Sequence, residues 1–311
     1  MISSPAVVNG VVYFVNTYDY LLAFNATTGA LLWSYPNGGG GGDPAVANGV
    51  VYVGSGNSYS VYAVNASTGA LLWSYATTGY VDRPTVANGI VYVSSWNPSY
   101  DSGNVYALEA RTGALLWMFP ADSGVYPPTV ANGVLYVVSN YGTVYALDPW
   151  YGIRLWSYAT GSSGTSAPAV AKGVVYVSSF DSSLYALNAN TGALLWRVGG
   201  AGNGVSFSPA VANGVVYAGS YESNLFALNA GTGAVLWGCL GCGFVEHSSP
   251  TVANGIVFVG SDDHNVYAFS LPHGNEAKED VAFKRPNPKT LRPDRSLKVS
   301  KPDATQSDAE L

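Results

Sequence analysis

Short apolar runs separated by polar turns fill most of the chain, and one pattern of them recurs throughout residues 1–274. Each copy opens with a segment like Ser-Pro-Ala-Val-Ala-Asn-Gly-Val-Val-Tyr-Val and closes with one like Leu-Tyr-Ala-Leu-Asn-Ala-Asn-Thr-Gly-Ala-Leu-Leu-Trp. The opening prolines follow one another at intervals of 39 to 44 residues: Pro5, Pro44, Pro84, Pro128, Pro168, Pro209 and Pro250. Self-similarity at such a period is typical of a protein built from stacked repeats.

Every copy predicts four short β-strands. The first two are joined by a dipeptide such as Asn48-Gly49, which favours a two-residue type I′ turn. Lys172-Gly173 replaces this dipeptide in the fifth copy, and we expect a less favourable turn there. The second strand is apolar at consecutive positions, as in residues 174–177, which is typical of a strand covered on both faces. The third strand alternates, and an Asn-Thr-Gly turn, in which Gly192 is free to take a left-handed conformation, leads to the fourth.

A four-stranded unit of this size cannot bury both of its faces alone, so it must stack on copies of itself. Radial stacking of such sheets gives a β-propeller. A repeat that contains a helix is the alternative, but no copy holds a ten-residue window with helical spacing. The sequence therefore predicts an all-β protein, a β-propeller of seven, or eight, four-stranded blades over residues 1–274.

Composition excludes several classes of protein. No apolar run approaches the roughly 20 residues that a membrane-spanning helix needs. Residues 1–274 carry five basic and twelve acidic side chains, which is the wrong sign for binding nucleic acid. Residues 275–311 carry 15 charges and a single aromatic residue, and we expect them to form a disordered tail. The opening residues have no basic region followed by an apolar stretch, so we expect no signal peptide.

Six of the seven copies end in a tryptophan: Trp33, Trp73, Trp117, Trp156, Trp196 and Trp237. A buried indole needs an acceptor for its N–H group, so we expect these residues to be structural. The segment Ala23-x-Asn25-x-x-Thr28-Gly29-x-x-x-Trp33 resembles the tryptophan-docking motif of the PQQ-like, or quinoprotein-type, β-propeller repeat family. The resemblance covers residues 3–274 and implies that each indole lies between its own blade and the next. In the seventh copy, Lys278 stands where the other copies have the tryptophan. We therefore expect blade seven to be three-stranded or completed by residues near 281–283.

The resemblance also raises two functions. The family contains PQQ-dependent dehydrogenases, which combine the quinone, a calcium ion and an aspartate base, and many carry a disulfide between adjacent cysteines. This chain has no adjacent cysteines, and most carboxylates of residues 1–274 fall in turns without forming one calcium site. We therefore expect a non-catalytic scaffold that binds a protein or peptide and needs no cofactor. The alternative is a dehydrogenase that depends on PQQ and calcium.

The chain is also similar to the propeller lipoprotein of the bacterial outer-membrane barrel assembly machinery. That likeness implies a periplasmic or extracellular location in the cell envelope, whereas the expected lack of a leader argues against it.

Two local features add candidate sites. Cys239, Cys242 and His247 could supply three zinc ligands or a redox pair, while a loop-closing disulfide or two plain thiols are the alternatives. Trp96 and Tyr100 lie in the longest loop between a second and a third strand, residues 96–103. Aromatic side chains on a loop favour contact with a partner, and folding back over the blade is the alternative. The loops, rather than the six tryptophans, are expected to carry recognition.

Overall fold

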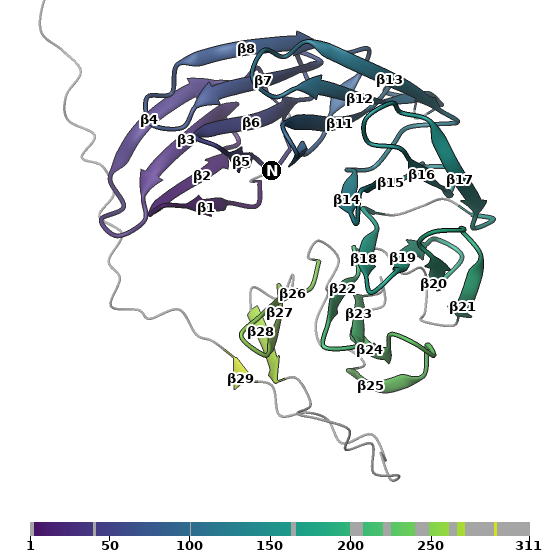
Figure 1. Ribbon diagram of the computed structural model, residues 1–311. Coiled ribbons are helices and arrows are strands. Elements are labelled where there is room, and N and C mark those ends of the chain that lie inside the picture. Colours follow the sequence, from purple (N-terminus) through teal and green to yellow (C-terminus); the bar gives the residue numbers. More distant parts are fainter. Residues whose placement is uncertain are drawn as a thin grey trace, which may run out of the picture.

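The computed structural model describes residues 3–39, 42–99, 101–162, 166–199, 208–219, 225–239, 249–260, 266–270 and 289–290. These residues form strands and turns without any helix, and the strands make seven antiparallel sheets. Figure 1 shows the sheets arranged one after another around a common centre. The predicted all-β propeller is therefore confirmed.

Each sheet is one copy of the repeat, with its four strands in sequence order from the centre outward (Figure 1). The innermost strands are β1 (Ala6–Val8), β5 (Ala45–Ala47), β10 (Thr85–Ala87), β14 (Thr129–Ala131), β18 (Ala169–Ala171), β22 (Ala210–Ala212) and β26 (Thr251–Ala253). The second strands are β2 (Val11–Val15), β6 (Val50–Ser55), β11 (Ile90–Trp96), β15 (Val134–Val138), β19 (Val174–Ser179), β23 (Val215–Gly219) and β27 (Ile256–Gly260).

The third strands are β3 (Tyr20–Asn25), β7 (Ser60–Asn65), β12 (Gly103–Glu109), β16 (Thr143–Leu147), β20 (Ser183–Asn188), β24 (Leu225–Asn229) and β28 (Val266–Ser270). The outer strands are β4 (Leu31–Pro36), β8 (Leu71–Ala76), β13 (Leu115–Ala121), β17 (Arg154–Ala159), β21 (Leu194–Val198), β25 (Val235–Cys239) and β29 (Lys289–Thr290). One further strand, β9 (Tyr80–Val81), adds to the third sheet by pairing with β11.

The outer strand of the seventh sheet comes from the C-terminal segment. Two residues, Lys289 and Thr290, pair with Ala268 and Tyr267 of β28. The pairing residues thus lie beyond the region near 281–283 that the sequence suggested for this role, and the sheet has four strands rather than three.

The turns between first and second strands have the predicted conformation. Asn48 and Gly49 both have positive φ, at 49° and 76°, as a type I′ turn requires. Lys172, which replaces asparagine in the fifth sheet, takes the same conformation with φ of 48°. A lysine side chain gains no local hydrogen bond that offsets the strain of this conformation, so the fold imposes the turn on it.

The hydrophobic core lies between the sheets. Val51 and Val53 of β6 are fully buried against Tyr13, Leu21 and other side chains of the first sheet. Tyr52, between them, faces the third sheet and packs in the next cluster. β6 is therefore covered on both faces, as its consecutive apolar residues predicted. Within the described residues, no helix is long and apolar enough to cross a membrane.

Candidate binding surfaces

The docking tryptophans bridge neighbouring sheets through their indole N–H groups. Five of the six donate to the backbone carbonyl of a residue in the following sheet, just after the third strand. The five bonds are Trp33 to Ala66 at 2.9 Å, Trp73 to Ala110 at 3.0 Å, Trp117 to Pro149 at 3.0 Å, Trp156 to Ala189 at 2.9 Å and Trp196 to Ala230 at 3.1 Å. The sixth, Trp237, packs against Phe269 of the seventh sheet with ring centroids 5.5 Å apart.

A tyrosine in the second strand of the first five sheets shares the same acceptor, a role that the sequence did not indicate. The hydroxyl of Tyr13 donates to the Ala66 carbonyl at 3.2 Å, and that of Tyr52 to the Ala110 carbonyl at 3.1 Å. Tyr92, Tyr136 and Tyr176 repeat the arrangement. Burial raises the pKa of Tyr92 to about 12, because the ionised phenol is poorly solvated there. The signal was present, since a tyrosine stands at this position in six copies.

A glycine of the following sheet packs against the ring of each of five docked indoles. A Cβ atom on Gly69, Gly113, Gly152, Gly192 or Gly233 would come within 2.6 to 2.9 Å of the indole from the preceding sheet. Each of these glycines has φ between 68° and 74° and lies three residues after the acceptor carbonyl. We call this acceptor carbonyl together with its glycine a tryptophan dock. The dock explains why the turn between third and fourth strands requires glycine.

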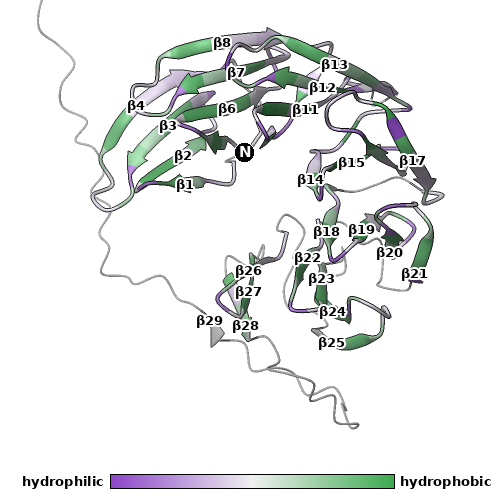
Figure 2. Ribbon diagram, in the orientation of Figure 1, coloured by the Kyte–Doolittle hydropathy of each residue, from purple (hydrophilic) through white to green (hydrophobic). Residues whose placement is uncertain are grey.

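The outer strands contain a β-bulge at the residue before each tryptophan. In the second sheet Ala63 pairs with Trp73 and Val64 pairs with Leu71, so Leu72 is left without a cross-strand partner. The same shift occurs in five other sheets. Bulged leucines are about half exposed: Leu32 at 49%, Leu72 at 49%, Leu116 at 48%, Leu155 at 52% and Leu195 at 49%. Figure 2 shows the apolar character of these outer strands.

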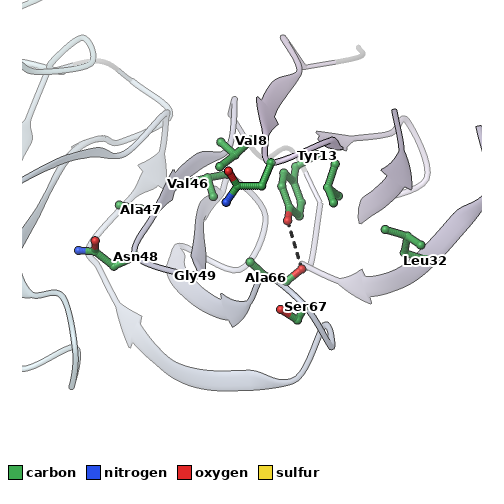
Figure 3. Close-up of a pocket in the computed structure, with 11 residues that line it drawn as sticks. Val8, Tyr13, Leu32, Val46, Ala47, Asn48, Gly49, Ala66 and Ser67 are labelled. Carbon is green, nitrogen blue, oxygen red and sulfur yellow. Dashed lines mark hydrogen bonds between the residues drawn. The ribbon is translucent and has the colours of Figure 1, made fainter. Parts of the chain in front are cut away.

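A pocket lies between the first and second sheets beside one of these leucines (Figure 3). Its apolar wall comes from Val8, Val11, Tyr13, Leu32 and Val46. Three polar residues also line the pocket: Asn9, Asn48 and Ser67. Figure 3 shows the hydroxyl of Tyr13 bonded to the Ala66 carbonyl at the base of this region. An apolar wall with a few polar groups is the usual chemistry of a site that accepts a side chain of a ligand.

Three charged residues lie where the linkers enter the innermost strands, at the ends of these strands away from the turns that line the pocket. Arg83 forms an ion pair with Asp43 at 3.5 Å. The half-buried carboxylate of Asp82 accepts a bond from the backbone N–H of Arg83 at 2.7 Å. Desolvation raises the pKa of Asp82, and the nearby charge of Asp43 raises it further, against the lowering effect of Arg83.

Replacing Asp82 by asparagine is expected to raise the melting temperature at pH 7, because the raised pKa means that the ionised carboxylate destabilises the folded state. This penalty is absent at low pH, where the carboxyl group is protonated in both states, and it grows as pH rises through the folded-state pKa. Asp82→Asn should therefore match the wild type at pH 3 and exceed it at pH 7 by about 2 °C or more. Calorimetry at both pH values measures this, with the exposed Asp19→Asn as control. A lower melting temperature at pH 7 would contradict the assignment.

The described residues do not fit a quinone–calcium site. They include no group of three or more His, Cys, Asp or Glu side chains able to hold a metal ion. The carboxylate of Asp181 already has two donors within the protein. Arg197 donates to it at 2.8 Å, and the Tyr185 hydroxyl donates to it at 2.5 Å. Calcium needs six to eight oxygen ligands converging from several segments, and this part of the chain does not supply them.

The structure places Trp96 at the end of β11, where it pairs with Tyr80 of β9. The two rings stack with centroids 4.5 Å apart and planes 22° apart, so Trp96 is half-buried against its own sheet. Contact of Trp96 with a partner stays a prediction. Tyr100, Cys242 and His247 lie outside the described residues, and Cys239 ends β25.

Comparison with protein families gives one match over most of the chain. The family is described as outer membrane protein assembly factor BamB, and it matches residues 2–82, 22–102, 101–239 and 180–281. No curated protein sequence matches the chain.

Several solved structures share the fold. BamB from Moraxella catarrhalis aligns with a TM-score of 0.72 and 22% identity over 88% of this chain and 83% of its own. The computationally designed Ika8 protein aligns with a TM-score of 0.74 and 19% identity, covering 94% of this chain and 86% of its own. Quinohemoprotein alcohol dehydrogenase ADHIIG from Pseudomonas putida HK5 aligns with a TM-score of 0.71 and 17% identity, covering 86% of this chain and 64% of its own. These likenesses support a propeller scaffold and leave its binding role to be argued from the surfaces.

Proposed function

Since the chain belongs to the family described as outer membrane protein assembly factor BamB, we propose that it is a non-catalytic scaffold that binds polypeptides in the bacterial cell envelope. The binding surface we assign is the set of bulged leucines Leu32, Leu72, Leu116, Leu155 and Leu195, with the pocket that Leu32 borders. No cofactor takes part in this function.

The half-exposed bulged leucines are the observation that carries the proposal. A leucine side chain at a β-bulge cannot pack against a cross-strand neighbour, and here it stays in solvent in five successive sheets. We assign these half-exposed leucines, repeated at the same position in five sheets, to contact with another polypeptide. The bulge also interrupts the free edge of each outer strand, so it protects that edge from extended pairing while leaving the leucine available.

The matched family's description indicates the chemistry of the partner. Segments of membrane β-barrels are about ten residues long and alternate apolar with polar side chains. Such a segment, before it folds, presents apolar side chains on one side only. We propose that these side chains occupy the pocket beside Leu32 and the equivalent positions beside the other bulged leucines, while the polar groups Asn48 and Ser67 contact the backbone of the segment.

A labelled ten-residue peptide that alternates valine with threonine is a direct probe. Fluorescence anisotropy should detect saturable binding to the whole protein. Replacing all five bulged leucines by serine is expected to weaken this binding at least tenfold, because each substitution removes a half-exposed apolar side chain from the contact. The substitutions lie on the surface, so the circular dichroism spectrum should not change.

The matched control replaces Ser34, Ser74 and Ser157, the exposed residues that follow three of the docking tryptophans, by alanine. This variant should bind the peptide as the wild type does. Equal binding by the leucine variant would contradict the assigned surface. Saturable binding of added PQQ and Ca²⁺, with reduction of a dye in the presence of an alcohol, would contradict the non-catalytic role.

A further inference from the structure

The first sheet contains a complete tryptophan dock. The Asn25 side chain accepts bonds from the backbone N–H groups of Thr27 and Thr28, both at 2.9 Å. Ala26 donates its N–H to the Gly10 carbonyl at 2.8 Å, as Ala66 does to Gly49 in the second sheet at 2.9 Å. Gly29 has φ of 70°. The turn of the first sheet therefore has the same construction as the turns that receive an indole elsewhere in the molecule.

Outside residues 28–30, no described atom lies within 4 Å of the position that a Cβ atom on Gly29 would take. At the five equivalent glycines an indole lies within 2.9 Å of that position. All eight tryptophans of the chain are among the described residues, so none of the remaining residues can supply an indole to Gly29. The seventh sheet has Phe258 at the position of the docking tyrosine, and the sequence has Lys278 at that of the tryptophan.

The face of the first sheet beside this dock is apolar and half-exposed. Val12, Phe14 and Phe24 line it, and the two phenylalanine rings stack with centroids 5.6 Å apart. The equivalent residues of the second sheet, Val51, Val53 and Val64, are fully buried against the first sheet. Figure 1 shows β26 to β28 of the seventh sheet standing apart from β1 to β4.

We propose that this face binds a β-strand segment of a second polypeptide that carries a tryptophan. The indole of the partner lies over Gly29 and donates its N–H to the Ala26 carbonyl, while apolar side chains of the partner cover Phe14 and Phe24. The five filled docks of the same molecule show which ligand these residues receive, down to the donor and the ring. The dock at Ala26 and Gly29 includes none of the five bulged leucines, so its test can fail while their binding of a peptide holds.

A synthetic peptide with the sequence of residues 70–76, Ala-Leu-Leu-Trp-Ser-Tyr-Ala, is the probe, with 5-fluorotryptophan as its reporter. Fluorine NMR should show saturable binding to the whole protein. Gly29→Ala is expected to weaken this binding at least tenfold, since its Cβ would occupy the space of the indole. Gly89→Ala is the matched control, because Gly89 lies in the third sheet, away from this dock, with φ of 76° and open space around a Cβ.

A second peptide keeps the proposal testable without any variant of the protein. Methylation of the indole nitrogen removes the donor and retains the ring, and it is expected to weaken binding about fivefold, the effect of one hydrogen bond. Equal binding of both peptides, or equal binding by Gly29→Ala and Gly89→Ala, would overturn the proposal. Self-association of the protein alone that Gly29→Ala abolishes would overturn it in favour of a second copy. The variant with five serines should still bind this peptide if the dock is the site.

Discussion

Replacing Trp73 by alanine is expected to lower the free energy of unfolding by about 3–5 kcal/mol, the cost of removing a large buried aromatic side chain. Trp73 is only 9% exposed and packs against Tyr52 with ring centroids 5.9 Å apart. It also covers Gly113 of the third sheet and donates to the Ala110 carbonyl. The substitution therefore opens a cavity between two sheets at a position where neither backbone can move inward without breaking its own strands.

Urea denaturation of the whole protein measures this loss. Trp73→Phe keeps an aromatic ring but loses the donor, and it should cost less than the alanine variant. The Ala110 carbonyl keeps the hydroxyl of Tyr52 as a donor in both variants. Trp150→Ala is the control, because Trp150 is 54% exposed and its removal is expected to change the free energy by less than about 0.5 kcal/mol. A loss below 1 kcal/mol for Trp73→Ala would show that the indole does not stabilise the contact between the second and third sheets.

Gly113→Ala is expected to destabilise the protein by about 2–5 kcal/mol, the sum of two effects. A left-handed backbone costs an alanine about 1–2 kcal/mol. Overpacking adds about 1–3 kcal/mol, since the new Cβ would approach Trp73 to 2.6 Å. Both terms act in the same direction, and the second one is specific to the dock.

Gly133→Ala separates the two effects in the same denaturation experiment. Gly133 has the same φ of 74° as Gly113, but nothing lies within 4 Å of its added Cβ. The free energy of unfolding of Gly133→Ala should therefore fall only by the cost of the left-handed backbone. Combining Gly113→Ala with Trp73→Ala should cost less than the sum of the two single variants, because the methyl group no longer meets the ring. Equal losses for the two glycine variants would show that the indole does not rest on Gly113.

The repeats made most of the fold predictable. Asn-Gly dipeptides marked the hairpins, and consecutive apolar residues marked strands buried on both sides. The outer strand of the seventh sheet was harder to place, because Lys289 and Thr290, which pair with β28, show no apolar pattern in the sequence. The pairing of β9 with the end of β11 was also missed, since two residues are too few to show a periodicity.

The candidate surfaces were less predictable than the fold. The sequence indicated that the indoles needed acceptors, but a backbone carbonyl such as that of Ala110 carries no side-chain signature. The bulge at Leu72 was hidden as well, because two adjacent leucines fit a buried strand as readily as an exposed bulge. The sequence predicts Trp96 in a loop, whereas in the structure it extends β11 and stacks on Tyr80. This contact depends on a linker more than ten residues away in sequence.

The contacts between neighbouring sheets have a direction. One sheet provides the indole N–H donor, and the sheet that follows provides the carbonyl acceptor. An interface of this kind is heterologous, so two identical faces cannot join across a two-fold axis. Duplication or deletion of one whole copy within the array recreates the same junction on either side. The gene can therefore gain or lose one repeat while each junction keeps a matching donor and carbonyl.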